Sequence, residues 1–443
     1  MPNELSIGAR RVGDFIDFYP ETPQVKATLE RSDRGISLTV PWSDPESEYA
    51  QWFMKDAGIM RLPAGPEPLP VPKRVLFRDS HGSVLLIRCW PRGYHSNVLG
   101  PGSGTLWARA AIMGPHEDLE FERPHGLKTE ISGLRAWLGM TSWHEQRDWS
   151  SSSRAATLAS QNPPAIEIGE HKGVALQFQP GWQIMREQDG DRRIALDLVR
   201  CVTRSDKPLA WDEHRQIHRA IRDLLVLSRW HVESCVEVSA LRKDDPPRTL
   251  DGTEHPSEQW RAVVVPNDER ASPPSRRQPH LLRYGELNEA GILRWLALRD
   301  EFARALDPVI SSVDLRGTTA NTMLAHVGPG LEALGYLLMM RDGVAERTAS
   351  RANLRTRFDR ILADVGECLP FDGPRWASTT VAAYNGLKHA NRAEPDPVDV
   401  LNAWRECVMV GRAWVAVQLG VSTDHVRARL ADDPQGAPFV AIE

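Results

Sequence analysis

The apolar run Leu331-Glu-Ala-Leu-Gly-Tyr-Leu-Leu-Met-Met340 decides the fold of the C-terminal part of the chain. It belongs to a helical stretch over Thr319–Arg341, which Pro329-Gly330 interrupts. Apolar residues recur at helical spacing on both sides of this stretch, and short breaks separate them. These breaks define four further helices, which we predict over Leu287–Leu306, Leu354–Val365, Arg375–Asn391 and Pro397–Leu419. Helices joined by short loops form antiparallel bundles, so we expect a helical bundle from Leu281 onward.

The N-terminal half has a different pattern, because short apolar or alternating runs are bounded there by Gly, Pro and Asp. Three breaks resemble hairpin turns, at residues 79–82, 169–173 and 188–191. This pattern predicts an antiparallel β-sandwich or open barrel. The predicted strands are Gln24–Glu30, Gly35–Val40, Lys73–Arg78, Ser83–Trp90, Thr105–Met113, Gly126–Ile131, Ala165–Ile168, Val174–Gln179, Gln183–Glu187 and Arg193–Val199.

The predicted fold class is therefore α+β, with a mixed segment between the two halves. That segment holds a helix over Trp211–Arg229 and strands over Cys235–Leu241 and Trp260–Val265. A length of 443 residues suits two or three domains. We place a β-rich domain at residues 1–205, the mixed region at 206–280, the bundle at 281–430 and a frayed tail at 431–443.

Composition narrows the class of protein. Hydrophobic residues make up 41% and charged residues 26%, as in a globular chain with ample core. The net charge of −5 means that any nucleic-acid contact must come from a local patch. The five cysteines are scattered and form no CxxC pair, which fits a reducing cytoplasm and argues against a disulfide framework or zinc ribbon. We expect a cytoplasmic protein with no signal peptide, no membrane span, no metal and no cofactor.

The stretch Val381-Ala-Ala-Tyr-Asn-Gly-Leu-Lys-His-Ala-Asn-Arg392 carries the candidate chemistry. If it continues as a helix, Asn385, Lys388, His389 and Arg392 share one face, because they lie three and four residues apart. Histidine exchanges a proton near neutral pH, and Lys and Arg bind phosphate. A metal-free RNA-cleaving site needs such groups. A solvated polar face at a helix end explains the same pattern, and spacing alone does not separate the two.

The order of these parts resembles the abortive-infection proteins of the ApeA type, which carry a C-terminal HEPN domain. The residues that carry the resemblance are Gly126–Gly139, Leu331–Gly335 and the hexapeptide Tyr384-Asn-Gly-Leu-Lys-His389. Active HEPN domains are metal-independent endoribonucleases that dimerise. Their motif is Arg, a polar residue, three to five others, and His. Asn385 matches the polar position and His389 the histidine, whereas Tyr384 stands where the family has Arg.

The resemblance implies that His389 acts as general base or acid while an RNA 2′-hydroxyl attacks the adjacent phosphate. Lys388 and Arg392 would stabilise the phosphate, and Asn385 would orient the hydroxyl or the imidazole. It also implies a cellular RNA substrate, with tRNA a candidate, a homodimer through the bundle, and a phage-derived trigger at the β-rich domain. No membrane partner is expected.

Two alternatives remain open at this point. Tyr384 in place of Arg favours a non-catalytic bundle that carries a β-rich ligand- or protein-binding domain. A carbohydrate-processing enzyme is less favoured, because no placed carboxylate pair is evident. Glu332, within an apolar helix, is expected either to reach solvent or to pair with a cation such as Arg355, Arg357, Lys388 or Arg392.

Overall fold

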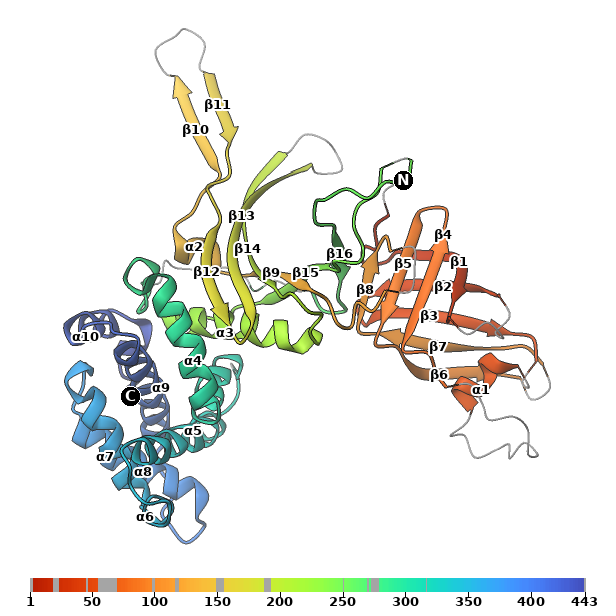
Figure 1. Cartoon of the computed structure of the whole chain (residues 1–443). Coiled ribbons are helices and arrows are strands. Elements are labelled where there is room, and N and C mark those ends of the chain that lie inside the picture. The colour runs from red at the N-terminus through yellow and green to blue at the C-terminus, as the bar shows by residue number, and fades with distance from the viewer. Residues whose placement is uncertain are drawn as a thin grey trace. The chain divides into compact units, whose positions relative to one another are not determined.

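The computed structural model describes residues 3–18, 24–44, 47–54, 70–97, 100–115, 119–148, 155–186, 193–249, 251–268, 271, 279–315 and 317–441. The chain forms two compact units. Unit 1 comprises residues 1–130, 200–216 and 236–270, and unit 2 comprises residues 131–199, 217–235 and 271–443. The predicted class, α+β, is confirmed: antiparallel strands dominate the first half and helices the last third (Figure 1).

Unit 1 is built on antiparallel strands whose spatial order is β9-β15-β16-β8-β5-β4-β1-β2-β3-β7-β6. The two-residue turn predicted before Gly82 is present, since Asp79 and Gly82 are paired across it. Side chains alternate between the core and the surface along β1, β2 and β3. The strands are β1 Arg10–Ile16, β2 Lys26–Ser32, β3 Gly35–Trp42, β4 Arg74–Asp79, β5 Gly82–Ile87, β6 Trp90–Ser96, β7 Gly102–Ala108, β8 Ala110–Met113, β9 Gly126–Ile131, β15 Cys235–Leu241 and β16 Trp260–Val264.

The short helix α1, Glu48–Met54, packs against β3, β6 and β7. Its Trp52 and Phe53 are buried. Phe53 stacks on Trp42 of β3 with ring centroids 5.8 Å apart. Aromatic side chains bury the most area per residue, so α1 closes the core of unit 1.

Some strand predictions were wrong. The predicted strand Thr105–Met113 is two strands, β7 and β8, which lie apart in the sheet. β1 and β6 were not predicted, because β1 contains a glycine that lets β4 approach closely and β6 contains Pro91 and Gly93. A Cβ added at Gly13 of β1 would lie 2.1 Å from the Arg78 carbonyl oxygen, so the pairing of β1 with β4 requires glycine there.

Unit 2 begins with α2 (Leu134–Leu138) and β-ribbons. In the β12–β13 hairpin, the turn Lys172-Gly173 has positive φ at both residues, as a type I′ turn requires. β13 is one long strand where two were predicted, and the predicted turn at 188–191 lies outside the described residues. The ribbon β10–β11 was not predicted. The strands are β10 Trp143–Asp148, β11 Ala155–Ser160, β12 Ile166–His171, β13 Val174–Arg186 and β14 Arg193–Arg204, the last of which continues into unit 1.

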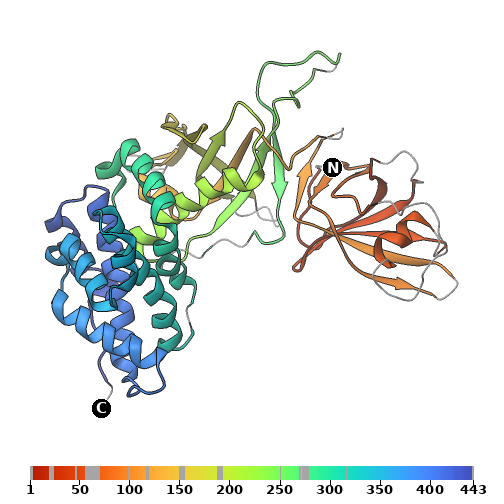
Figure 2. The same ribbon diagram turned by 60° about the horizontal axis from the view of Figure 1, so that its bottom comes forward.

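The rest of unit 2 is a helical bundle, and Figure 2 shows its helices side by side. α5 is central, because it packs against α4, α7, α8 and α9. The predicted helix Leu354–Val365 is confirmed to the residue as α7, and α4 continues through Pro308 past its predicted end at Leu306. The helices are α3 Trp211–Arg229 (its C-terminal part), α4 Tyr284–Ser311, α5 Ala320–Arg341, α6 Glu346–Arg351, α7 Leu354–Val365, α8 Gly373–Lys388, α9 Pro397–Gln418 and α10 Thr423–Ala431.

Among the described residues, α5 is the one helix long and apolar enough to cross a membrane by length and composition. Half of its apolar window is buried inside the structure. Leu324, Leu331 and Leu338 have no exposed surface. This burial is that of the core helix of a bundle.

Candidate functional site

The candidate stretch lies at the C-terminal end of α8. The helix begins at Asp372, whose carboxylate accepts a hydrogen bond of 2.6 Å from the Arg375 backbone N–H. Trp376 stacks on Phe358 of α7, with ring centroids 5.0 Å apart and the planes 20° from parallel. These contacts fix α8 in the bundle and position its last turn, which holds Tyr384, Asn385 and Lys388.

The helix ends at Lys388, three residues before the predicted end at Asn391. His389 has extended dihedral angles, φ −127° and ψ 106°, and the chain then folds back over the last turn. A Cβ at Gly386 would lie 2.9 Å from the Ala393 carbonyl oxygen and 3.0 Å from Pro395 Cδ. The loop segment that contains Ala393 and Pro395 occupies the space that another helical turn would need. Proline at position 395 also cannot continue a helix.

The prediction of one shared helical face is therefore wrong. Asn385 and Lys388 lie on the last turn, whereas His389 and Arg392 lie in the loop that follows it. A turn still keeps the two loop residues close, because the Arg392 backbone N–H donates to the His389 carbonyl oxygen at 2.9 Å. The stretch thus brings these four side chains to one end of the bundle without aligning them along a helix.

Tyr384, which stands at the motif's Arg position, is part of the core. Its side chain is only 3% exposed. A Cβ at Gly328 of α5 would lie 2.5 Å from the tyrosine ring, so the ring needs glycine beneath it. Burial, with the nearby Glu332 and Cys407, raises the pKa of Tyr384 to about 12. Tyr384 therefore stays neutral and cannot bind a phosphate as Arg would.

Lys388 is held over this ring. Its Nζ lies 4.7 Å from the centroid of Tyr384 and 3.9 Å from Glu332 Oε2. Glu332 binds Arg357 of α7 more tightly, with 2.6 Å between Oε1 and Nη1. The expectation that Glu332 pairs with a cation is thus confirmed. Lys388 remains 43% exposed, so a cation is available beside the loop.

The remaining residues of the stretch are open to solvent or nearly so. His389 and Arg392 are exposed, and Asn385 is half-buried. The side chains of Asn385, His389 and Arg392 make no hydrogen bond or ion pair with any other residue that the structure describes. Imidazole, amide and guanidinium are therefore all available to a ligand.

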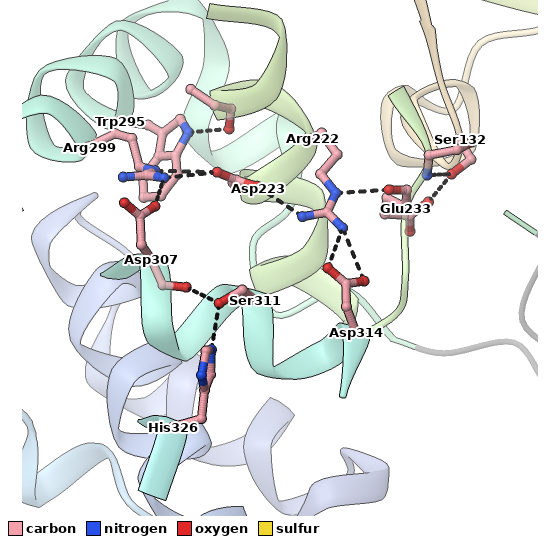
Figure 3. A network of polar contacts seen from close by, with 12 residues as sticks. Ser132, Arg222, Asp223, Glu233, Trp295, Arg299, Asp307, Ser311, Asp314 and His326 are labelled. Atoms are coloured by element: carbon pink, nitrogen blue, oxygen red, sulfur yellow. Dashed lines mark hydrogen bonds and ion pairs between the residues drawn. The ribbon is translucent and has the colours of Figure 1, made fainter. Parts of the chain in front are cut away.

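A polar network links α3 to the bundle in unit 2 (Figure 3). Arg222 of α3 donates to the Glu233 carbonyl oxygen at 2.8 Å and pairs with Asp314 at 3.3 Å. Asp223, the next residue, accepts from Arg299 of α4 at 3.2 Å. Burial raises the pKa of Asp223, and Arg299 and Arg222 oppose that shift. These ion pairs join α3 to α4 and to the residues that follow α4.

A buried ion pair in unit 2 was not predicted from the sequence. Arg412 of α9 has no exposed side-chain surface and lies 2.7 Å from Asp433, just beyond α10. It also donates to the Leu227 carbonyl oxygen at 2.8 Å. The sequence does contain a sign of this pair, because Arg412 is a charged residue within an apolar run of α9. Charged residues in such runs are rarely buried unless they are paired.

The family model described as ApeA N-terminal domain 1 matches residues 15–293, more than half of the chain. The chain belongs to the ApeA family. No curated protein and no solved structure matches it. The family match ends within α4, whose Arg299 and Asp307 belong to the network in Figure 3. The ApeA region is therefore tied, through α3 and α4, to the helices that carry the candidate stretch.

Proposed function

We propose that the chain is a HEPN-type, metal-independent endoribonuclease that acts in the cytoplasm in phage defence. The observation that carries this proposal is the exposed His389 with Asn385 four residues before it, at the end of a bundle helix and without competing partners. Membership of the ApeA family supports the setting in abortive infection.

In the proposed reaction, the RNA 2′-hydroxyl attacks the adjacent phosphorus. A P–O2′ bond forms and the P–O5′ bond breaks, giving a cyclic phosphate and a 5′-hydroxyl. His389 takes the proton from the 2′-oxygen or gives one to the leaving 5′-oxygen. Two copies of His389, one from each subunit of a homodimer, would supply both roles.

The phosphate charge must be stabilised without the family's Arg. Lys388 and Arg392 are the candidates, because both side chains are exposed next to His389. Tyr384 has a positioning role in this scheme: its buried ring lies against Lys388 and keeps the ammonium group at the end of α8. Asn385 orients the attacking hydroxyl or the imidazole.

Inducible expression in a bacterial host tests the proposal. Wild type should arrest growth, and His389→Ala should abolish the arrest while the protein accumulates to the same level. His144→Ala is the control, because His144 is another exposed histidine of unit 2. Growth arrest by the His389→Ala protein equal to that by wild type would refute the nuclease assignment.

A non-catalytic bundle with a β-rich binding domain is the second candidate. The burial of Tyr384 favours it, because no arginine occupies the motif position. This candidate predicts no RNA cleavage at any expression level, and a partner of the β-rich region whose binding survives His389→Ala.

A further inference from the structure

One face of the β9–β14 strand pair in unit 1 gathers three cations. Arg200 and Arg204 of β14 are four residues apart, so both point to the same side of the strand. Lys128 of β9 is paired with Val202, which lies between them on that side. The opposite face is the one that α3 covers, where Thr203 contacts His214.

The carboxylates on this face match two of the three cations. Glu130 lies 3.4 Å from Arg200, and Glu258 lies 3.0 Å from Arg204. Lys128 forms no ion pair with any carboxylate in the described part of the chain. Among the described residues, Glu130 and Glu258 each pair with an arginine, so Lys128 is the cation of this face that has no ion-pair partner.

An aromatic ring holds the unmatched ammonium. Lys128 Nζ lies 4.2 Å from the ring centroid of Trp260, and Arg204 Cζ lies 5.2 Å from it. The indole N–H donates to Glu258 at 2.8 Å, which fixes the orientation of the ring. Lys128, Arg204 and Trp260 are each half-buried. The ammonium is thus placed rather than free to sample solvent.

We propose that this face of unit 1, formed by Lys128, Arg200, Arg204 and Trp260, is a binding site for a phosphate-bearing ligand. Phosphate oxygens accept hydrogen bonds from ammonium and guanidinium groups and would give Lys128 an anionic partner. The phosphate can come from a free polyphosphate or nucleotide, or from a nucleic-acid backbone.

The protonation of Lys128 agrees with this geometry. Burial and the charges of Arg204 and Arg200 lower the pKa of Lys128 to about 8, and Glu258 opposes the shift. Glu130 is the other carboxylate of this face. Only the protonated amine attracts an anion, so affinity should fall as the pH rises from 7 to 9.

Isothermal titration calorimetry of the full chain with sodium tripolyphosphate tests the proposal. At pH 7 we expect Lys128→Gln to weaken binding by about tenfold or more, the loss typical of one charge-assisted hydrogen bond. Lys26→Gln should bind as wild type, because Lys26 is exposed on β2 and pairs with Asp14. Lys128→Arg should keep binding at pH 9, where wild type loses it.

A single-stranded oligouridylate separates the two sources of phosphate. Tighter binding than tripolyphosphate, with a steep salt dependence, assigns the site to a nucleic-acid backbone. Weaker binding assigns it to a free polyphosphate or nucleotide. The proposal is overturned if wild type does not bind either probe, or if Lys128→Gln binds both as wild type does.

Discussion

The buried pair of Arg412 and Asp433 gives the sharpest stability prediction. Their side chains are 0% and 3% exposed and lie 2.7 Å apart. Arg412→Met keeps most of the volume but leaves a buried carboxylate without its cation. Breaking one partner of such a pair costs about 3–5 kcal/mol. The Leu227 carbonyl oxygen at the end of α3 also loses its donor.

Hydrogen–deuterium exchange measures this cost locally, so the result does not depend on unit 1. A loss of about 3–5 kcal/mol corresponds to a rise of about two to four decades in amide exchange for α9 and α10. Arg427→Met is the control, because Arg427 is exposed on α10, and it should change stability by less than about 0.5 kcal/mol. The double variant Arg412→Met/Asp433→Leu should lose less stability than the sum of the losses of the two single variants, by about 1–3 kcal/mol. Equal exchange in Arg412→Met and Arg427→Met would show that the ion pair of Arg412 and Asp433 does not stabilise α9 and α10.

Three further predictions concern single side chains. Gly328→Ala should destabilise unit 2 by about 1–3 kcal/mol in urea unfolding, because its methyl group would overlap the Tyr384 ring. Gly366→Ala is the matched control, because a methyl group at Gly366 would meet no atom within 4 Å. Tyr384 ionises near pH 10 when unfolded but near 12 when folded, so its contribution to stability is present below pH 10 and is lost between 10 and 12; Tyr384→Phe should unfold less in that range. Lys128 has the opposite linkage, since its folded pKa of about 8 lies below that of the unfolded chain; Lys128→Met should raise the thermal midpoint at pH 7 and leave it unchanged at pH 11.

Local signals in the sequence were sufficient for most helices. Asp396-Pro397 begins α9, and the Asp396 carboxylate accepts from the Val398 backbone N–H at 2.8 Å. Asn353 begins α7 in the same way, with a 2.8 Å bond from Thr356. Caps and apolar periodicity depend on residues within one or two turns, so a sequence shows them directly.

The end of α8 was not predictable in this way, because it depends on contact between the last turn and the returning chain. Gly386 and Pro395 lie nine residues apart, and their contact stops the helix before His389. The pairing of Glu332 with Arg357 was one of several open choices for the same reason. Which cation reaches Glu332 is decided by how α5 and α7 pack.

His389 is the proposed catalytic residue of RNA cleavage, and the chemistry of the new RNA ends tests this role directly. Purified wild-type and His389→Ala proteins are incubated with total cellular RNA in the presence of EDTA, and new 5′-hydroxyl ends are mapped. We expect new 5′-hydroxyl ends with wild type and none with His389→Ala. Identical ends from both proteins would show that His389 does not catalyse the cleavage.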